Sequence, residues 1–159
     1  MIRLRNSLQR RLVWASVFAV ATLLGTGILL AAELTLELRL IWGTNQKLAK
    51  TKYKEVEPAM VDKLTNNVAA STKWKYYYEI NRMTNSVPSR GSRAFKISDK
   101  CTIEITELEG PRVEAKLIGE GKPINRVVEP LTKGKWFSLG GEEKNGTAWF
   151  VIVTELDEK

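Results

Sequence analysis

The pattern of hydrophobic and polar positions divides the chain into one long apolar run and a series of short alternating segments. No charged residue lies between Leu12 and Ala32, a run of 21 residues. At 1.5 Å of rise per residue this run would span about 31 Å as a helix, close to the ~30 Å hydrocarbon core of a bilayer. The pattern therefore predicts a transmembrane helix near the N-terminus.

A cleavable signal peptide is the alternative for this run. Its apolar region is shorter, about 7–15 residues, and small residues occupy positions −3 and −1 of its cleavage site. Cleavage after Ala32 would place Leu30 at −3, which is too large a side chain. Cleavage after Gly27 would leave an apolar new terminus. We therefore expect an anchor that is retained.

Basic residues before the run predict its orientation. Arg3, Arg5, Arg10 and Arg11 precede it with no acidic residue among them. The positive-inside rule places this tail in the cytoplasm and the rest of the chain on the other side. The sequence therefore predicts a single-pass protein of a cell inner membrane, with a periplasmic or otherwise extracytoplasmic C-terminal domain.

The segment that follows the apolar run has two interpretations. AAELTLELRLIW contains good helix formers and precedes Gly43, and in one continuous helix Trp14 and Trp42 would lie about 42 Å apart, near the two headgroup regions. We therefore expect the helix to continue to residue 42 as an outer extension. The alternation of leucine at positions 34, 36, 38 and 40 favours a strand instead.

A short helix and a strand are predicted after a polar, lysine-rich linker. Pro58 suits a first helical turn, and the apolar residues that follow it have helical spacing, which predicts an amphipathic helix over 58–70. KWKYYYEINR, residues 73–82, alternates as a strand does. Residues 83–93 have the composition of a basic surface loop.

From residue 94 onward the pattern is that of β structure. EGPR predicts a tight turn between two alternating segments, and Asn145-Gly146 predicts a hairpin. TAWFVIV, residues 147–153, is apolar on both faces and predicts a central strand. The predicted strands lie near 94–98, 102–108, 112–118, 126–131, 135–139 and 147–155.

These elements predict an α+β chain: a single N-terminal transmembrane helix, a short amphipathic helix, and a small antiparallel β sandwich or barrel. The predicted divisions are a cytoplasmic basic tail (1–11), the transmembrane helix with its outer extension (12–42), a juxtamembrane linker with the amphipathic helix (43–72), and an extracytoplasmic β-rich domain (73–159).

The composition limits the chemistry. The chain has no histidine and one cysteine, Cys101. This argues against most zinc, copper and haem sites, against intramolecular disulfides, and against histidine-based catalysis. Cys101 opens a predicted strand, where a small core residue is expected. We therefore expect no metal, no cofactor and no enzymatic activity.

The net charge of +7 is unevenly distributed. Residues 39–100 carry 13 basic and 5 acidic side chains. Basic residues close to a membrane meet anionic lipid headgroups or an acidic neighbouring subunit. We expect these partners, and no nucleic acid, for a domain outside the cytoplasm.

Several side chains are candidates for contact with partners. Small residues spaced four apart in the apolar run favour close approach to other membrane helices, either those of other subunits or those of further copies of the chain. Lysines follow the anchor, aromatic side chains interleave with lysines in the strand at 73–82, and arginines lie in the loop at 83–93. The candidates are Ala15, Ala19, Ala21, Gly25, Lys50, Lys52, Lys54, Trp74, Tyr77, Arg90 and Arg93.

These features predict a non-catalytic accessory, scaffold or assembly subunit of a bacterial membrane or envelope complex. The alternative is a membrane-anchored domain that binds an extracytoplasmic ligand, such as a cell-wall glycan, through Trp74, Tyr77 and the loop at 83–93. A weaker alternative is an anchored hydrolase. Ser86 lies two residues before Pro88, which resembles the nucleophile region of type I signal peptidases, enzymes with a Ser–Lys pair. The methionine expected after that serine is absent, and so is the Gly-Asp element of the family.

Overall fold

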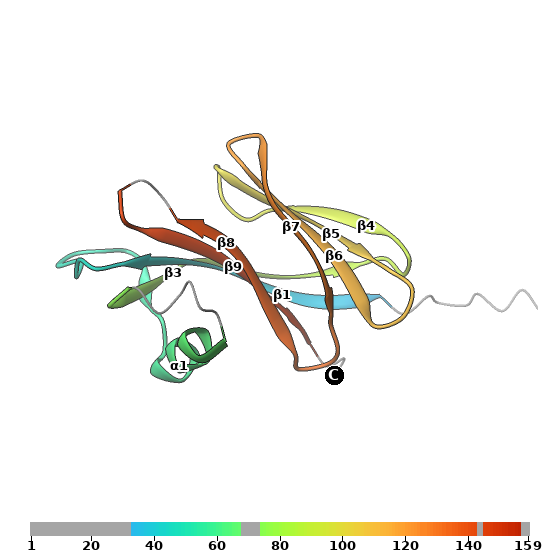
Figure 1. The fold of residues 1–159 in the computed structure, drawn as a ribbon, viewed down its shortest axis with the longest axis horizontal. Helices are drawn as coiled ribbons and strands as arrows, with labels where there is room; N and C mark the ends of the chain where they lie inside the picture. Colours follow the sequence, from blue (N-terminus) through green and yellow to red (C-terminus); the bar gives the residue numbers. More distant parts are fainter. Residues whose placement is uncertain (1–32, 68–73, 143–144, 157–159) are drawn as a thin grey trace, which may run out of the picture. The chain divides into compact units, whose positions relative to one another are not determined.

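The computed structural model describes residues 33–67, 74–142 and 145–156, which form a β sandwich with one short helix (Figure 1). One sheet has five strands in the order β2 (Lys54–Glu55), β3 (Tyr76–Val87), β1 (Leu34–Thr44), β9 (Ala148–Glu155) and β8 (Trp136–Glu142). The other has four, in the order β4 (Ser92–Lys96), β5 (Cys101–Glu107), β6 (Arg112–Gly119) and β7 (Lys122–Pro130). Neighbouring strands are antiparallel throughout.

The main core lies between the two sheets. Because side chains alternate across a strand, every second residue of β5 and β6 points to the five-stranded sheet. Ile103 and Ile105 of β5 and Leu117 of β6 are fully buried there, against Leu36 and Leu38 of β1. The alternation predicted for the segments at 102–108 and 112–118 is thereby confirmed.

A second core covers the outer face of the five-stranded sheet. Helix α1 (Pro58–Asn67) packs there, with Leu64 buried against the cluster that contains Ile41, Phe150 and Ile152. Strand β9 therefore has apolar side chains on both faces, as expected for a strand that is covered on both sides, whereas β1 contributes Ile41 to this second core. The prediction that TAWFVIV is a central strand is confirmed, because β9 lies between β1 and β8.

The predicted helical extension to residue 42 is wrong. Residues 34–44 form β1, the middle strand of the five-stranded sheet, as the leucine alternation indicated. Pairing with β3 on one side and β9 on the other outweighs the modest helix propensity of the segment. Trp42 consequently belongs to the domain, with its ring 6.1 Å from that of Tyr78. The predicted transmembrane helix over 12–32 lies outside the described residues, and the described helix is not long and apolar enough to cross a membrane.

Two other boundaries differ from the predicted ones. Strand β3 extends to Val87, into the predicted loop, because β1 pairs with it along its whole length. Strand β7 begins at Lys122, after a turn in which Glu120 and Gly121 have φ of 50° and 78°. The turns expected at EGPR and at Asn145-Gly146 are confirmed, and Gly110 and Gly146 adopt the positive φ that glycine allows.

Candidate functional site

A row of aromatic side chains crosses the five-stranded sheet at the end where β1 finishes. Trp42 is paired with Tyr78 of β3 and with Trp149 of β9, so the three residues lie side by side on the face that also carries Leu40. Tyr78 is buried, and its hydroxyl accepts a hydrogen bond from the Leu48 N–H at 3.1 Å. Trp42 and Trp149 are half-buried and keep part of their ring surface free.

A pocket of about 340 Å³ is lined by both tryptophans. Leu40 of β1 and Ile80 of β3 continue its apolar wall. The opposite wall belongs to the four-stranded sheet, where the β4–β5 and β6–β7 turns contribute Ser98, Lys100 and Glu120. The pocket thus has an aromatic wall and a polar wall.

Hydrogen bonds and an ion pair fix the polar wall. The Glu120 N–H donates to the Lys100 carbonyl at 2.8 Å, and Lys100 Nζ lies 3.1 Å from the Glu120 carboxylate. The Lys100 N–H donates to Ser98 Oγ at 3.3 Å. The backbone bond and the ion pair join the two turns, and the charged side chains of both are exposed at the rim.

Ile124 forms part of the pocket because Gly119 has no side chain. A Cβ on Gly119 would lie 2.2 Å from Ile124 Cδ1, so only glycine allows this approach without a shift of the isoleucine. Ile124 is one of two large hydrophobic side chains that are notably exposed among the described residues. Its position gives the pocket an apolar edge on the β7 side.

Cys101 also lines the pocket, and the pKa of its thiol is raised. Burial raises the pKa of Cys101 to about 11. The thiol is therefore protonated at neutral pH, whereas the thiolate is the nucleophile and the metal ligand. Among the residues that the structure describes, no group of three or more His, Cys, Asp or Glu side chains is arranged to hold a metal ion.

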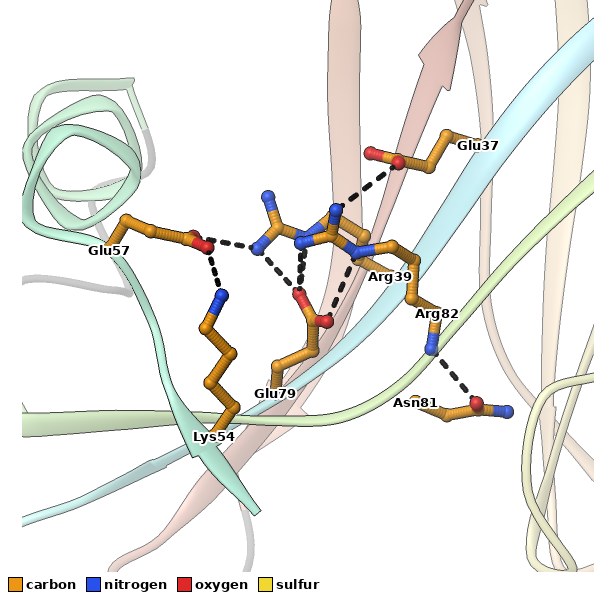
Figure 2. Close-up of polar contacts among 7 residues, drawn as sticks. All are labelled: Glu37, Arg39, Lys54, Glu57, Glu79, Asn81 and Arg82. Carbon is orange, nitrogen blue, oxygen red and sulfur yellow. Dashed lines mark hydrogen bonds and ion pairs between the residues drawn. The ribbon is translucent and has the colours of Figure 1, made fainter.

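A cluster of charged side chains lies on the other face of the five-stranded sheet, next to α1 (Figure 2). Arg39 is buried, and it contacts the carboxylates of Glu79 at 2.5 Å and Glu57 at 3.1 Å. Arg82 contacts Glu79 at 2.9 Å. Lys54 contacts Glu57 at 2.9 Å.

The cluster fixes the start of α1. The Glu57 carbonyl accepts hydrogen bonds from the N–H groups of Met60 and Val61, so Glu57 caps the helix while its carboxylate is held by Arg39. Hydrogen bonding from Lys54 and Arg39 lowers the pKa of Glu57 to about 2. Burial alone would raise the pKa of Glu79, but hydrogen bonds from the arginines lower it overall. The ion pairs of Arg39 with Glu57 and Glu79 thus connect the start of α1 to strands β1 and β3.

The three lysines that are predicted to contact partners lie on the surface. Lys50, Lys52 and Lys54 are all exposed. Lys54 belongs to the charged cluster, and Lys52 lies over the ring of Tyr53 at 5.4 Å. We call residues 45–53, which carry Lys47, Lys50 and Lys52, the lysine loop.

Trp74 and Tyr77 are not surface residues, which corrects their predicted role in ligand binding. They are 7% and 2% exposed. The Trp74 indole N–H donates to the Gly146 carbonyl at 2.9 Å, and its ring meets Phe150 edge-on at 5.6 Å. They are buried because α1 and Val56 cover this face, whereas alternation alone assigns Tyr77 to a solvent face.

Arg90, Arg93 and Ser86 lie near one another in sequence, and each has a hydrogen-bond partner in the structure. The Arg90 N–H donates to the Glu107 carboxylate at 2.8 Å, and the Arg93 side chain donates to the Ser86 carbonyl at 2.9 Å. The Ser86 hydroxyl donates to the Glu33 carboxylate. The structure assigns Ser86 no lysine partner among the described residues. The small residues Ala15, Ala19, Ala21 and Gly25 lie outside the described part of the chain.

The pocket was not anticipated from the sequence. Trp42 was expected at a membrane surface and Trp149 in a core, while the polar wall depends on turns whose side chains meet only in the folded sandwich. The signal that was present is the alternation of β1, which places Trp42 on the same face as Leu36, Leu38 and Leu40. Comparison with known proteins gives no further guide, since no family model, no curated protein and no solved structure matches the chain.

Proposed function

We propose that the chain is a non-catalytic accessory or assembly subunit of a bacterial membrane or envelope complex. In this proposal residues 12–32 anchor it in the inner membrane, the basic tail is cytoplasmic, and the β sandwich is the extracytoplasmic interaction domain. The observation that supports it best is the lysine loop, a basic and exposed segment held on the sandwich. Its backbone is attached to the domain by the hydrogen bond from Leu48 to Tyr78.

The lysine loop lies at the end of β1 opposite to the one at which the chain enters the domain. Strand β1 runs for 11 residues from Leu34 to Thr44, and the loop follows directly. At about 3.3 Å per residue, the strand places the loop roughly 33 Å along the sheet from the residue at which the chain enters the domain. A neighbouring subunit with an acidic surface can be reached by the basic side chains at that end of the sheet.

Native-gel electrophoresis of the full chain, extracted from its host membranes in mild detergent, tests the proposal. We expect the wild type to migrate in a larger complex. The variant Lys50→Glu/Lys52→Glu should weaken the complex more at low than at high ionic strength, because salt screens exposed charges. Lys54 is left unchanged, since its substitution would disturb the charged cluster.

The matched control is Lys133→Glu/Lys135→Glu. Lys133 lines a pocket that also contains Leu34, so it belongs to the opposite end of β1 and changes the net charge equally. This control should leave the complex intact. Gly25→Leu should separately weaken contacts of the anchor by steric exclusion. Migration of the wild type as a monomer that no variant alters would overturn the proposal.

A further inference from the structure

We propose that the pocket over Trp42 and Trp149 binds a pyranose ring of a neutral glycan, which goes beyond the interaction role proposed above. The pocket volume of about 340 Å³ lies at the lower end of the ~300–1,000 Å³ range of ligand sites. It suits one sugar ring or two, with the rest of an oligosaccharide extending through the mouth.

The aromatic wall suits the apolar face of such a ring. A pyranose with equatorial hydroxyl groups exposes axial C–H bonds on its faces, and these pack against flat aromatic surfaces. Trp42 and Trp149 are directly opposite each other on adjacent strands, so their Cβ atoms lie about 4.5–5.5 Å apart, and both side chains line the pocket. Both rings are large and rigid, and contact with them requires little ordering of side chains.

The polar wall suits the hydroxyl edge of the same ring. Sugar hydroxyl groups both donate and accept hydrogen bonds. Lys100 supplies a donor, the Glu120 carboxylate supplies an acceptor, and Ser98 supplies a hydroxyl. The backbone hydrogen bond from Glu120 to Lys100 joins the two turns, so both side chains start from neighbouring points of the rim.

The charge balance of the rim favours a neutral ligand. Lys100 and Glu120 compensate each other at 3.1 Å, so an anionic group would meet the glutamate and a cationic group the lysine. A purely apolar ligand would cover the rim groups without offering hydrogen bonds, which costs binding energy. A neutral ligand with many hydroxyl groups satisfies both walls.

Isothermal titration of the full chain with cellotetraose and with chitotetraose tests this inference. The chain is kept in a polyoxyethylene detergent, because alkyl glycoside detergents carry a sugar ring of the proposed class. We expect millimolar or tighter binding of at least one of the two. The rim variant Lys100→Ala/Glu120→Gly should bind at least tenfold more weakly, since it removes the donor and the acceptor; glycine also suits the positive φ at position 120.

A second variant fills the pocket. A Cβ on Gly141, the residue paired with Trp149, would meet only Ile124, at 3.9 Å, so Gly141→Leu has room for a side chain beside that tryptophan. It should also abolish binding. The control is Lys96→Ala/Asp99→Ala, which removes a comparable exposed ion pair that lines a neighbouring pocket instead.

Three outcomes would overturn the inference: neither sugar binds the wild type, binding survives both pocket variants, or the apolar anion n-octanoate binds at the pocket while the sugars do not. Retention of the larger complex in the native gel would leave the proposed function intact in each case.

Discussion

Replacing Arg39 by methionine tests the role of the buried charged cluster in the stability of the domain. The Arg39 side chain is 6% exposed and that of Glu79 is 14% exposed. Removal of one partner from a buried ion pair typically costs about 3–5 kcal/mol, because the other charge stays buried and uncompensated. Arg82 remains 2.9 Å from Glu79, so we expect the lower end of that range, about 3 kcal/mol.

The loss should be visible in the melting temperature. An unfolding entropy of about 2.1 cal/mol/K per residue, taken over the roughly 125 residues of the domain, converts 3 kcal/mol to a decrease of about 11 °C. Circular dichroism of the full chain in mild detergent measures it. The double variant Arg39→Met/Glu79→Leu should recover part of the loss, because apolar residues can replace a buried ion pair once both charges are removed.

The pH dependence gives this prediction a second measurement. Glu57, with its pKa lowered from 4.5 to about 2, and Glu79, whose pKa is also lowered, stabilise the folded state above the usual carboxyl pKa. That stabilisation decreases as the pH falls from about 4.5 towards 2. The difference between wild type and Arg39→Met should therefore be full at neutral pH and smaller near pH 3. A melting temperature within about 2 °C of the wild type at neutral pH, or a difference that does not change with pH, would refute the reasoning.

Further predictions concern the core, the thiol, a close backbone approach and the topology. Phe150→Ala should cost about 3–5 kcal/mol in urea unfolding, because the ring is 4% exposed, whereas the half-buried Trp149→Ala should cost less. Cys101 should react with iodoacetamide much more slowly in the native chain than in urea, because burial raises its pKa to about 11. Gly140→Ala should cost about 2 kcal/mol or more, since its Cβ would lie 2.2 Å from the Trp149 carbonyl oxygen, while Gly141→Ala is the tolerated control. A reporter that is active only in the cytoplasm should be inactive when it is fused after Lys159; full activity would reverse the proposed orientation.

Local patterns predicted those parts of the fold whose contacts are close in sequence. The hairpins of β5 with β6 and of β8 with β9 join neighbouring segments through short turns, and alternation shows which residues face the core. Strand β1 was harder, because it directly follows an apolar run and contains good helix formers. Its state depends on partners such as Val87 and Glu155, which are far away in the sequence.

The pocket illustrates the same limit for sites. Its aromatic wall requires Trp42 and Trp149, more than a hundred positions apart, to be paired across β1 and β9. No spacing rule connects two such residues, although Trp42 follows a visibly alternating segment and Trp149 lies in a segment that predicts a central strand. Conversely, the sequence predicts that Trp74 and Tyr77 are surface residues that contact a ligand, whereas both are buried. The pattern of a strand does not show whether a helix covers its second face.

The position of β1 connects the proposed surfaces with each other. The chain enters the domain at one end of this strand, where Leu34 lines a small pocket with Arg112 and Lys133. The lysine loop and the aromatic pocket both lie at its other end, since Trp42 is two residues before Thr44. Strand β1 pairs with β3 on one side and with β9 on the other. The pocket and the lysine loop thus lie at the end of a strand that is paired on both sides, which is where a binding site would gain the most from being rigid.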